Sequence, residues 1–123
     1  MGLKKSIVAV DDSGIVLQTL EGMLGDRYEF RGFAKPARAL RYMAQFPPSL
    51  VILDIDMPEV DGYKMLEMIR DIPELRYIPI IFLTSNKDKS YVIKAVKHGA
   101  SDYMVKPVNR DTLLSKIEAL LLW

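Results

Sequence analysis

The sequence lacks several features that would point to particular classes of protein. It contains no cysteine, which excludes disulfide bonds, thiolate catalysis and zinc sites with cysteine ligands. No apolar run approaches the roughly 18 residues of a membrane span, and the apolar run near the N-terminus, residues 7–10, is too short for a signal peptide. Neither sign of charge dominates, because 17 lysines and arginines oppose 16 aspartates and glutamates. This balance argues against bulk electrostatic binding to nucleic acid or membrane, so we expect neither as a partner. Without a membrane span, a signal peptide or cysteines, we expect a cytoplasmic protein.

Short apolar runs alternate with amphipathic segments along the chain. The runs are rich in Val, Ile and Leu, as in parallel strands buried on both faces, and cover residues 7–10, 50–53, 78–83 and 103–105, with a weaker run at 28–33. Between them, apolar residues recur at helical spacing: Val16, Leu20, Met23 and Leu24; Ala37, Leu40 and Met43; Leu66 and Ile69; Val92, Ala95 and Val96; Leu113, Ile117, Leu120 and Leu121. This order predicts one α/β domain over residues 1–123, with a five-stranded parallel sheet doubly wound as (βα)5.

Polar residues stand where the apolar runs stop, and in such a sheet the carboxyl ends of the strands share one edge, where ligands bind. They are Asp11 and Asp12, Asp54 and Asp56, Thr84 and Ser85, and Lys106. Crowded carboxylates repel unless a cation intervenes, and oxygen ligands without histidine or cysteine point to Mg2+ or Mn2+. Because Mg2+ readily accepts a phosphate ligand, this edge predicts phosphoryl chemistry with a carboxylate nucleophile.

Each of these residues also has an ordinary structural interpretation. An Asp-Asp pair after a strand is usually a turn or a helix cap. Thr84 alone is most often a cap, and Lys106 alone a solvated side chain. The single histidine, His98, precedes Gly99 at an expected helix end, where a cation complements the helix dipole, so we interpret it as structural. Complementary groups at four strand ends together favour a shared site over independent structural roles.

Four segments carry a resemblance that extends from Lys5 to the C-terminus: VAVDDS, VILDIDMPEVDG, IPIIFLTS and YMVKP. In order and spacing they resemble the receiver (CheY-like) domain of two-component response regulators, which has a flavodoxin-like fold. The resemblance implies that Asp54 is the phospho-accepting aspartate. It further implies that Asp12 and Asp54 bind Mg2+, with Asp11 nearby or bound through water, and that Asp56 contributes its backbone carbonyl.

The same resemblance assigns roles at the other strand ends. Lys106 matches the lysine that pairs with the acceptor carboxylate and then with the phosphoryl group. Thr84 matches the switch hydroxyl and Tyr103 the switch aromatic. Pro107 stands at a position associated with a cis Lys-Pro bond.

The implied partners are a histidine kinase or histidine phosphotransfer protein as donor, and a downstream effector protein or a fused output domain as target. The surface expected to change is the fourth helix, fifth strand and fifth helix, residues 87–123. A homodimer through this surface would use Asp102 and Lys116, but Thr112 stands where an acidic partner is expected. We expect Leu114, Leu122 and Trp123 to lie off the buried face of the last helix, at a dimer interface or leading into a further segment.

Three alternatives to the phosphorylation switch stay open from the sequence. A phosphorylation-independent interaction module is disfavoured by the complete set of polar residues. A small phosphatase with an aspartyl-phosphate intermediate would need a cap or substrate pocket that short loops leave little room for, so we expect no enzyme beyond self-phosphorylation and autodephosphorylation. A flavodoxin-like cofactor binder is disfavoured because the acidic pair after the first strand would repel a phosphate. The chain is either a stand-alone regulator or one domain of a longer protein.

Overall fold

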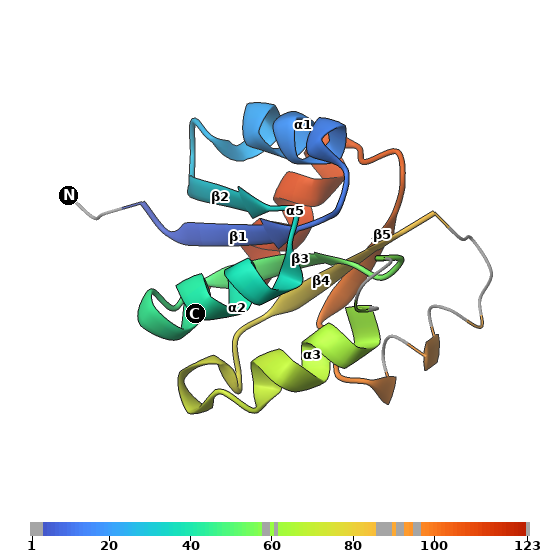
Figure 1. The fold of residues 1–123 in the computed structure, drawn as a ribbon. Helices are drawn as coiled ribbons and strands as arrows, with labels where there is room; N and C mark the ends of the chain where they lie inside the picture. The colour runs from blue at the N-terminus through green and yellow to red at the C-terminus, as the bar shows by residue number, and fades with distance from the viewer. Residues whose placement is uncertain are drawn as a thin grey trace.

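The computed structural model describes residues 4–57, 60, 62–85, 90, 93–94 and 97–122. Five strands form one sheet in the order β2-β1-β3-β4-β5, and every neighbouring pair is parallel (Figure 1). The strands are β1 (Ser6–Val10), β2 (Glu29–Phe33), β3 (Leu50–Asp54), β4 (Ile80–Thr84) and β5 (Asp102–Val105). The expected strands are confirmed, with the second and fourth each beginning one or two residues later than the apolar runs.

Four α-helices and one 3-10 turn are described: α1 (Gly14–Leu24), α2 (Pro36–Gln45), α3 (Gly62–Arg70), the turn η1 (Pro73–Leu75) and α5 (Arg110–Leu120). Two of the helices begin at side-chain caps. Ser13 Oγ accepts a hydrogen bond from the Val16 N–H, and Asn109 Oδ1 accepts one from the Thr112 N–H. The helix expected around residues 92–96 falls mostly outside the described residues.

The core lies in two layers, one on each face of the sheet. Because side chains alternate along a strand, Val8 and Val10 of β1 pack with α2 and α3, whereas Ile7 and Ala9 pack with α1 and α5. The central strands β1, β3 and β4 are consequently apolar on both faces, as their sequences predict. This arrangement confirms the doubly wound fold.

The end of the chain differs from the expectation at one residue. Leu114 is only 5% exposed and belongs to the core cluster that α5 forms with α1. The buried stripe of α5 is therefore wider than a single row of apolar residues. Leu122 is 81% exposed, as expected, and Trp123 lies outside the described residues. Among the described helices none is long and apolar enough to cross a bilayer.

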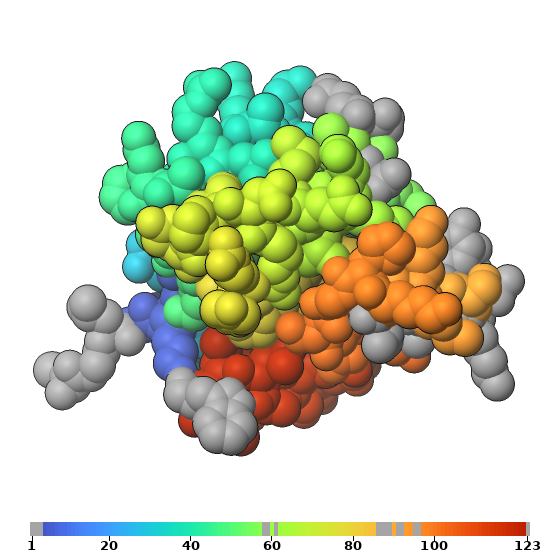
Figure 2. Space-filling model, turned by 90° about the horizontal axis from the view of Figure 1, so that it is seen from below, coloured from blue at the N-terminus to red at the C-terminus, as the bar shows by residue number. Residues whose placement is uncertain are grey.

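The strand order changes direction between β1 and β3, because β2 lies on one side of β1 and β3 on the other. At such a point the connections leave to opposite faces, and a crevice forms beyond the carboxyl ends of the two strands. Figure 2 shows the molecule from below, where α2, α3 and η1 lie side by side. The functional residues are thus to be sought where β1 and β3 end.

Candidate functional site

Three aspartates converge beyond the carboxyl ends of β1 and β3. The register pairs Val10 with Leu53, so that the residues that follow, Asp11 and Asp54, lie side by side. Asp11, Asp12 and Asp54 each offer a carboxylate oxygen, and these oxygens all lie within 4.8 Å of one another. Asp11 and Asp54 are each 1% exposed, whereas Asp12 is exposed. The site therefore has a buried carboxylate pair and a third carboxylate at its mouth.

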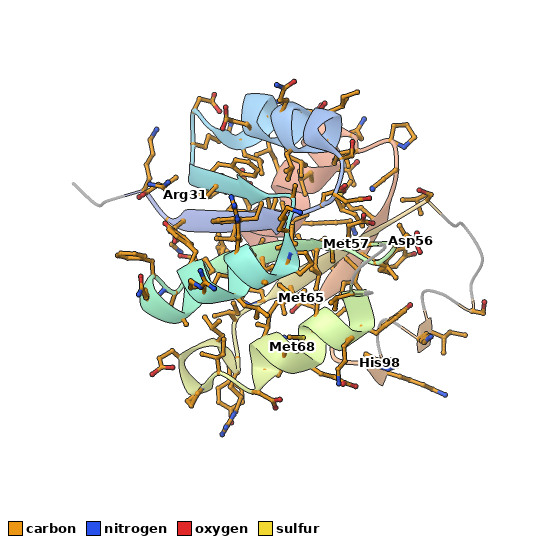
Figure 3. The ribbon with its side chains drawn as sticks, in the orientation of Figure 1. Arg31, Asp56, Met57, Met65, Met68 and His98 are labelled. Carbon is orange, nitrogen blue, oxygen red and sulfur yellow. The ribbon has the colours of Figure 1, made fainter. Side chains whose placement is uncertain are left out.

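Main-chain donors orient the two buried carboxylates. Asp11 Oδ1 accepts a hydrogen bond from the Ser13 N–H at 2.9 Å, and Asp54 Oδ1 accepts one from the Asp56 N–H at 3.1 Å. In both cases the donor is two residues farther along, which is the geometry of an Asx turn. Figure 3 shows Asp56 beyond the end of β3, where the chain leaves the sheet.

Lys106 supplies the positive charge of the site. It follows β5, where its N–H donates to the Thr84 carbonyl at 2.8 Å, and its peptide bond to Pro107 is cis. Its ammonium Nζ lies 2.9 Å from Asp11 Oδ2 and 3.4 Å from Asp54 Oδ1. One cation therefore contacts both buried carboxylates, which leaves a net negative site.

The surroundings raise the pKa of both Asp54 and Lys106. Burial raises the pKa of the Asp54 carboxyl above its ordinary value, and the charge of Asp11 raises it further, against the Asp56 N–H and Lys106, which lower it. Burial alone would lower the pKa of Lys106, but the carboxylates of Asp11 and Asp54 together raise it above its ordinary value. The site is thus short of positive charge.

Comparison with known proteins agrees with this geometry. Residues 7–118 match the response regulator receiver domain. The chain belongs to the response regulator receiver domain family. Members of this family act as phospho-accepting switches in two-component systems, and Mg2+ binding is typical of them. The fold and the resemblance expected from the sequence are thereby confirmed.

Individual relatives show the extent of the similarity. The two-component response regulator ARR12 of Arabidopsis thaliana is 37% identical over 110 residues, which cover 87% of this chain and 18% of that protein. The chemotaxis protein CheY4 of Vibrio cholerae superposes with a TM-score of 0.91 at 28% identity, covering 97% of this chain and all of the other. The chain spans between 17% and 49% of the length of eight curated relatives that it matches.

The receiver domain of the sensor histidine kinase PA1611 of Pseudomonas aeruginosa has been solved with a magnesium ion coordinated in its active-site cleft. It superposes on this chain with a TM-score of 0.88 at 25% identity, and covers 98% of this chain and all of the other. In the present chain, the clustered carboxylates of Asp11, Asp12 and Asp54 are hard oxygen donors at ligand spacing, and the cluster contains no histidine or cysteine. The residues present therefore fit Mg2+.

The two expected switch residues lie on neighbouring strands. Thr84 is 2% exposed at the end of β4, next to Asp54 on β3 because the register pairs Asp54 with Leu83. Tyr103 on β5 pairs with Phe82, is half-buried, and packs on the α2–α3 side of the sheet. Since Phe82 and Thr84 are two residues apart, Thr84 and Tyr103 share that side. Tyr103 lies on β5, two strands away from Asp54 on β3.

The sequence interpretation assigned no role to Gly62, although it belongs to one of the quoted motifs. Its N–H donates to the Ile55 carbonyl at 2.8 Å. A Cβ at this position would lie 2.6 Å from Ile55 Cα and 2.7 Å from the Asp54 carbonyl oxygen. Glycine therefore allows α3 to begin directly against the end of β3, which helps to hold Asp54 in place. The glycine at the end of the segment VILDIDMPEVDG is the sequence signal that could have indicated this close approach.

An apolar hollow adjoins the site on the α1 side. Its volume is about 130 Å³, and its lining includes Ile15, Lys106, Pro107 and Val108. Ile15 is 78% exposed, so the hollow offers an apolar side chain to solvent beside the charged site. A partner that approaches Lys106 would meet this apolar surface.

Proposed function

We propose that this receiver domain is a phosphorylation-dependent signalling switch in which Asp54 accepts a phosphoryl group in a Mg2+-dependent reaction. The observation that carries the proposal is the shared contact of one ammonium with two buried carboxylates, 2.9 Å from Asp11 and 3.4 Å from Asp54. A buried acidic pair that is incompletely neutralised destabilises the folded chain, and phosphoryl transfer gives it a chemical use. Asp54 is the acceptor because it lies at the end of the central strand β3, between Asp11, which follows β1, and Thr84 at the end of β4.

In this proposal the metal site consists of the carboxylates of Asp11, Asp12 and Asp54, with the main-chain carbonyl of Asp56 as a further ligand. Bound Mg2+ would neutralise charge on the transferring group and favour the ionised form of Asp54. Mn2+ has the same oxygen preference. The exposed position of Asp12 would let the ion enter and leave from solvent.

The reaction is a displacement at phosphorus. A carboxylate oxygen of Asp54 forms the new P–O bond, and the P–N bond of a donor phosphohistidine breaks, its electron pair returning to the imidazole. Lys106 then exchanges part of its contact with Asp54 for a phosphoryl oxygen, and the Thr84 hydroxyl donates to another. Water later attacks the phosphorus, which releases inorganic phosphate and restores Asp54.

The donor in this proposal is a histidine kinase or a histidine phosphotransfer protein. The apolar hollow beside Lys106, with Ile15 at its margin, is the surface on which such a donor would rest. Because the relatives are longer than this chain, the signal would pass to a fused output domain or to a separate effector. The chain itself would catalyse only its own phosphorylation and dephosphorylation, and a cytoplasmic location remains a prediction.

The readout begins at Thr84 in this proposal. Movement of its hydroxyl toward the phosphoryl group would leave space on the α2–α3 side of the sheet, into which Tyr103 turns. A homodimer through β5 and α5 remains a prediction. Asp102 and Lys116 pair with each other within one chain at 3.0 Å, so a dimer would require them to exchange partners.

The test is direct phosphorylation. The protein is incubated with Mg2+ and acetyl phosphate, and its intact mass is measured. Wild type should gain one acid-stable, base-labile phosphoryl group, and Asp54→Asn should gain none. Absence of labelling in wild type would favour the phosphorylation-independent module. Equal labelling of Asp54→Asn would move the acceptor elsewhere.

A further inference from the structure

The positive charge of this receiver domain is unevenly placed along the chain. Residues 30–53 contain four cationic residues, Arg31, Lys35, Arg38 and Arg41, and no aspartate or glutamate. The whole chain carries a net charge of +1, so the other 99 residues together carry −3. A segment of 24 residues therefore holds an excess of positive charge that the overall balance conceals.

The fold gathers three of these cations on one surface. Arg31 lies on β2, at the edge of the sheet (Figure 3). Arg38 and Arg41 are exposed on α2, whose opposite side is buried. The Arg31 guanidinium lies over the Tyr42 ring, 5.3 Å from its centroid, and Tyr42 in turn lies 5.2 Å from Phe46. We name Arg31, Arg38, Arg41, Tyr42 and Phe46 the α2 basic surface. Its aromatic members include a large exposed side chain, since Phe46 is 59% exposed.

Within the described part of the chain, the side chains of Arg38 and Arg41 have no hydrogen bond or ion pair. Five cations elsewhere in the described chain are differently placed, because a carboxylate lies within ion-pair distance of each of them: Arg27, Lys64, Lys106, Arg110 and Lys116. Arg70 donates to three carbonyls. No described residue therefore occupies the guanidinium donors of Arg38 and Arg41, which a partner could bind.

Helix α2 holds these charges at a cost to its own stability. Its first turn contains no acidic residue, and the N-cap residue Lys35 makes no side-chain capping bond. Cations near a helix N-terminus oppose the helix dipole, and like charges three residues apart repel each other. Among the residues that the structure describes, no carboxylate lies within ion-pair distance of Arg38 or Arg41, so we look for their use in a partner.

We propose that the α2 basic surface docks a short acidic segment of a partner protein, one that also carries an aromatic or large aliphatic residue. The guanidinium groups would bind carboxylates in bidentate fashion, and the apolar residue would pack on Phe46 and Tyr42. This surface is distinct from the phosphorylation site and does not depend on the function proposed above.

Acidic groups border the surface, which argues for a short occupant. Helix α2 is ten residues long, about 15 Å. It begins at Pro36, three residues after β2 ends at Phe33. The Phe33 carbonyl accepts a hydrogen bond from the Asp11 N–H, so this end of α2 lies near the carboxylate cluster. Glu29 begins β2 at the other end of the strand. A long polyanion such as nucleic acid would run from the basic surface onto these carboxylates and be repelled, whereas a few carboxylates on a protein segment would fit.

The experiment is a titration of the isotope-labelled whole chain with a synthetic 12-residue peptide of glutamates with one central phenylalanine, followed by NMR. The expected shifts concentrate on residues 31–46, and binding weakens as salt is added. Arg38→Glu/Arg41→Glu should weaken binding at least tenfold. Lys97→Glu/Arg110→Glu, which changes the net charge equally on other surfaces, should stay within twofold of wild type. A peptide with glutamine in place of glutamate should not bind.

Three results would overturn the proposal. The first is a peptide footprint outside residues 31–46, and the second is equal weakening by the two charge-reversed variants. The third is tighter binding of a 12-nucleotide single strand, or of vesicles containing phosphatidylserine, to the same residues. Circular dichroism checks that each variant folds. If Arg38→Glu/Arg41→Glu does not fold, Arg41→Ala/Phe46→Ala provides the same test, with loss of binding expected and unchanged binding contradicting it.

Discussion

Replacing Asp54 with asparagine should stabilise the metal-free receiver domain, although it removes the proposed acceptor. The change keeps the shape of the side chain and deletes its charge. Two Coulomb terms change in opposite directions. At an effective dielectric constant of about 20, the repulsion from Asp11 at up to 4.8 Å is about 3.5 kcal/mol, and the attraction to Lys106 at 3.4 Å is about 4.9 kcal/mol. At this upper limit of the Asp11 distance the attraction exceeds the repulsion by about 1.4 kcal/mol. The charge of Asp54 is therefore destabilising overall only because its burial outweighs this difference.

Burial disfavours the charged form, in agreement with the raised pKa of Asp54. We therefore expect Asp54→Asn to increase the free energy of unfolding at neutral pH, because it removes a buried charge whose ionised form the folded chain disfavours. The pH dependence follows from the same shift. The unfolded chain ionises Asp54 at a lower pH than the folded chain does, so wild type loses stability as the pH rises from the ordinary pKa through the folded one. The advantage of Asp54→Asn should accordingly be largest at neutral pH and vanish in acid.

The assay is urea unfolding with EDTA at several pH values, compared with Asp71→Asn, which removes an exposed carboxylate and leaves the site intact. The slope of the unfolding free energy against urea should be the same in all three proteins, so that the midpoints report stability. If Asp54→Asn is no more stable than wild type at pH 7 without divalent ions, the account of the site as short of positive charge is wrong.

Other expectations follow from the same coordinates. Mg2+ should stabilise wild type by about 2.7 kcal/mol at a hundred times its dissociation constant, and Asp54→Asn by less, as measured by urea unfolding with and without the ion. Lys106→Met should abolish labelling by acetyl phosphate, and retained labelling would contradict its role. It should also lower the free energy of unfolding by about 2 kcal/mol, which is less than the loss of a fully buried ion pair because the Lys106 side chain is 21% exposed. Gly62→Ala should cost about 1 to 3 kcal/mol through its contacts with the end of β3, whereas Gly22→Ala, where a Cβ meets nothing within 4 Å, should not destabilise the chain. Ile15→Ala should slow phosphoryl transfer from a phosphohistidine protein several-fold and leave labelling by acetyl phosphate unchanged; equal slowing of both would rule out a docking role.

The sequence predicts most of the fold because the signals for its central strands are local. Strands such as β3 and β4, apolar on both faces, are recognised from composition alone, and strand ends can be marked by the polar residue that follows. Leu114 was misplaced because the width of a buried helix face depends on what packs against it. Here α5 packs beside α1 over the sheet, which buries one more row of side chains.

Within the site, the sequence predicts which residues meet but not how they share charge. The meeting of Asp11 with Asp54 follows once two parallel strands are neighbours with their carboxyl ends aligned. The contact of Lys106 with both carboxylates, and the contrast between buried Asp11 and exposed Asp12, depend on side-chain directions that no spacing encodes. The α2 basic surface was missed for another reason. Net charge averages over the whole chain, and Arg31 comes to lie over Tyr42 of α2 only when β2 and α2 pack together.

The sheet itself provides the shortest route from Asp54 to the surface proposed to change. Neighbouring strands lie about 4.8 Å apart, and the register sets Asp54 beside the end of β4, where Thr84 lies, with β5 the next strand. Thr84 and Tyr103 lie on the same side of the sheet, so a hydroxyl that moves toward Asp54 vacates space on the side where Tyr103 is already half-buried. Tyr103 lies on an edge strand, where a ring can turn without displacing a further strand. In the proposed switch, the acidic cluster of Asp11, Asp12 and Asp54 lies two strands from Tyr103. The phosphoryl group on Asp54 would couple the two by attracting the Thr84 hydroxyl, which lies on the strand between them.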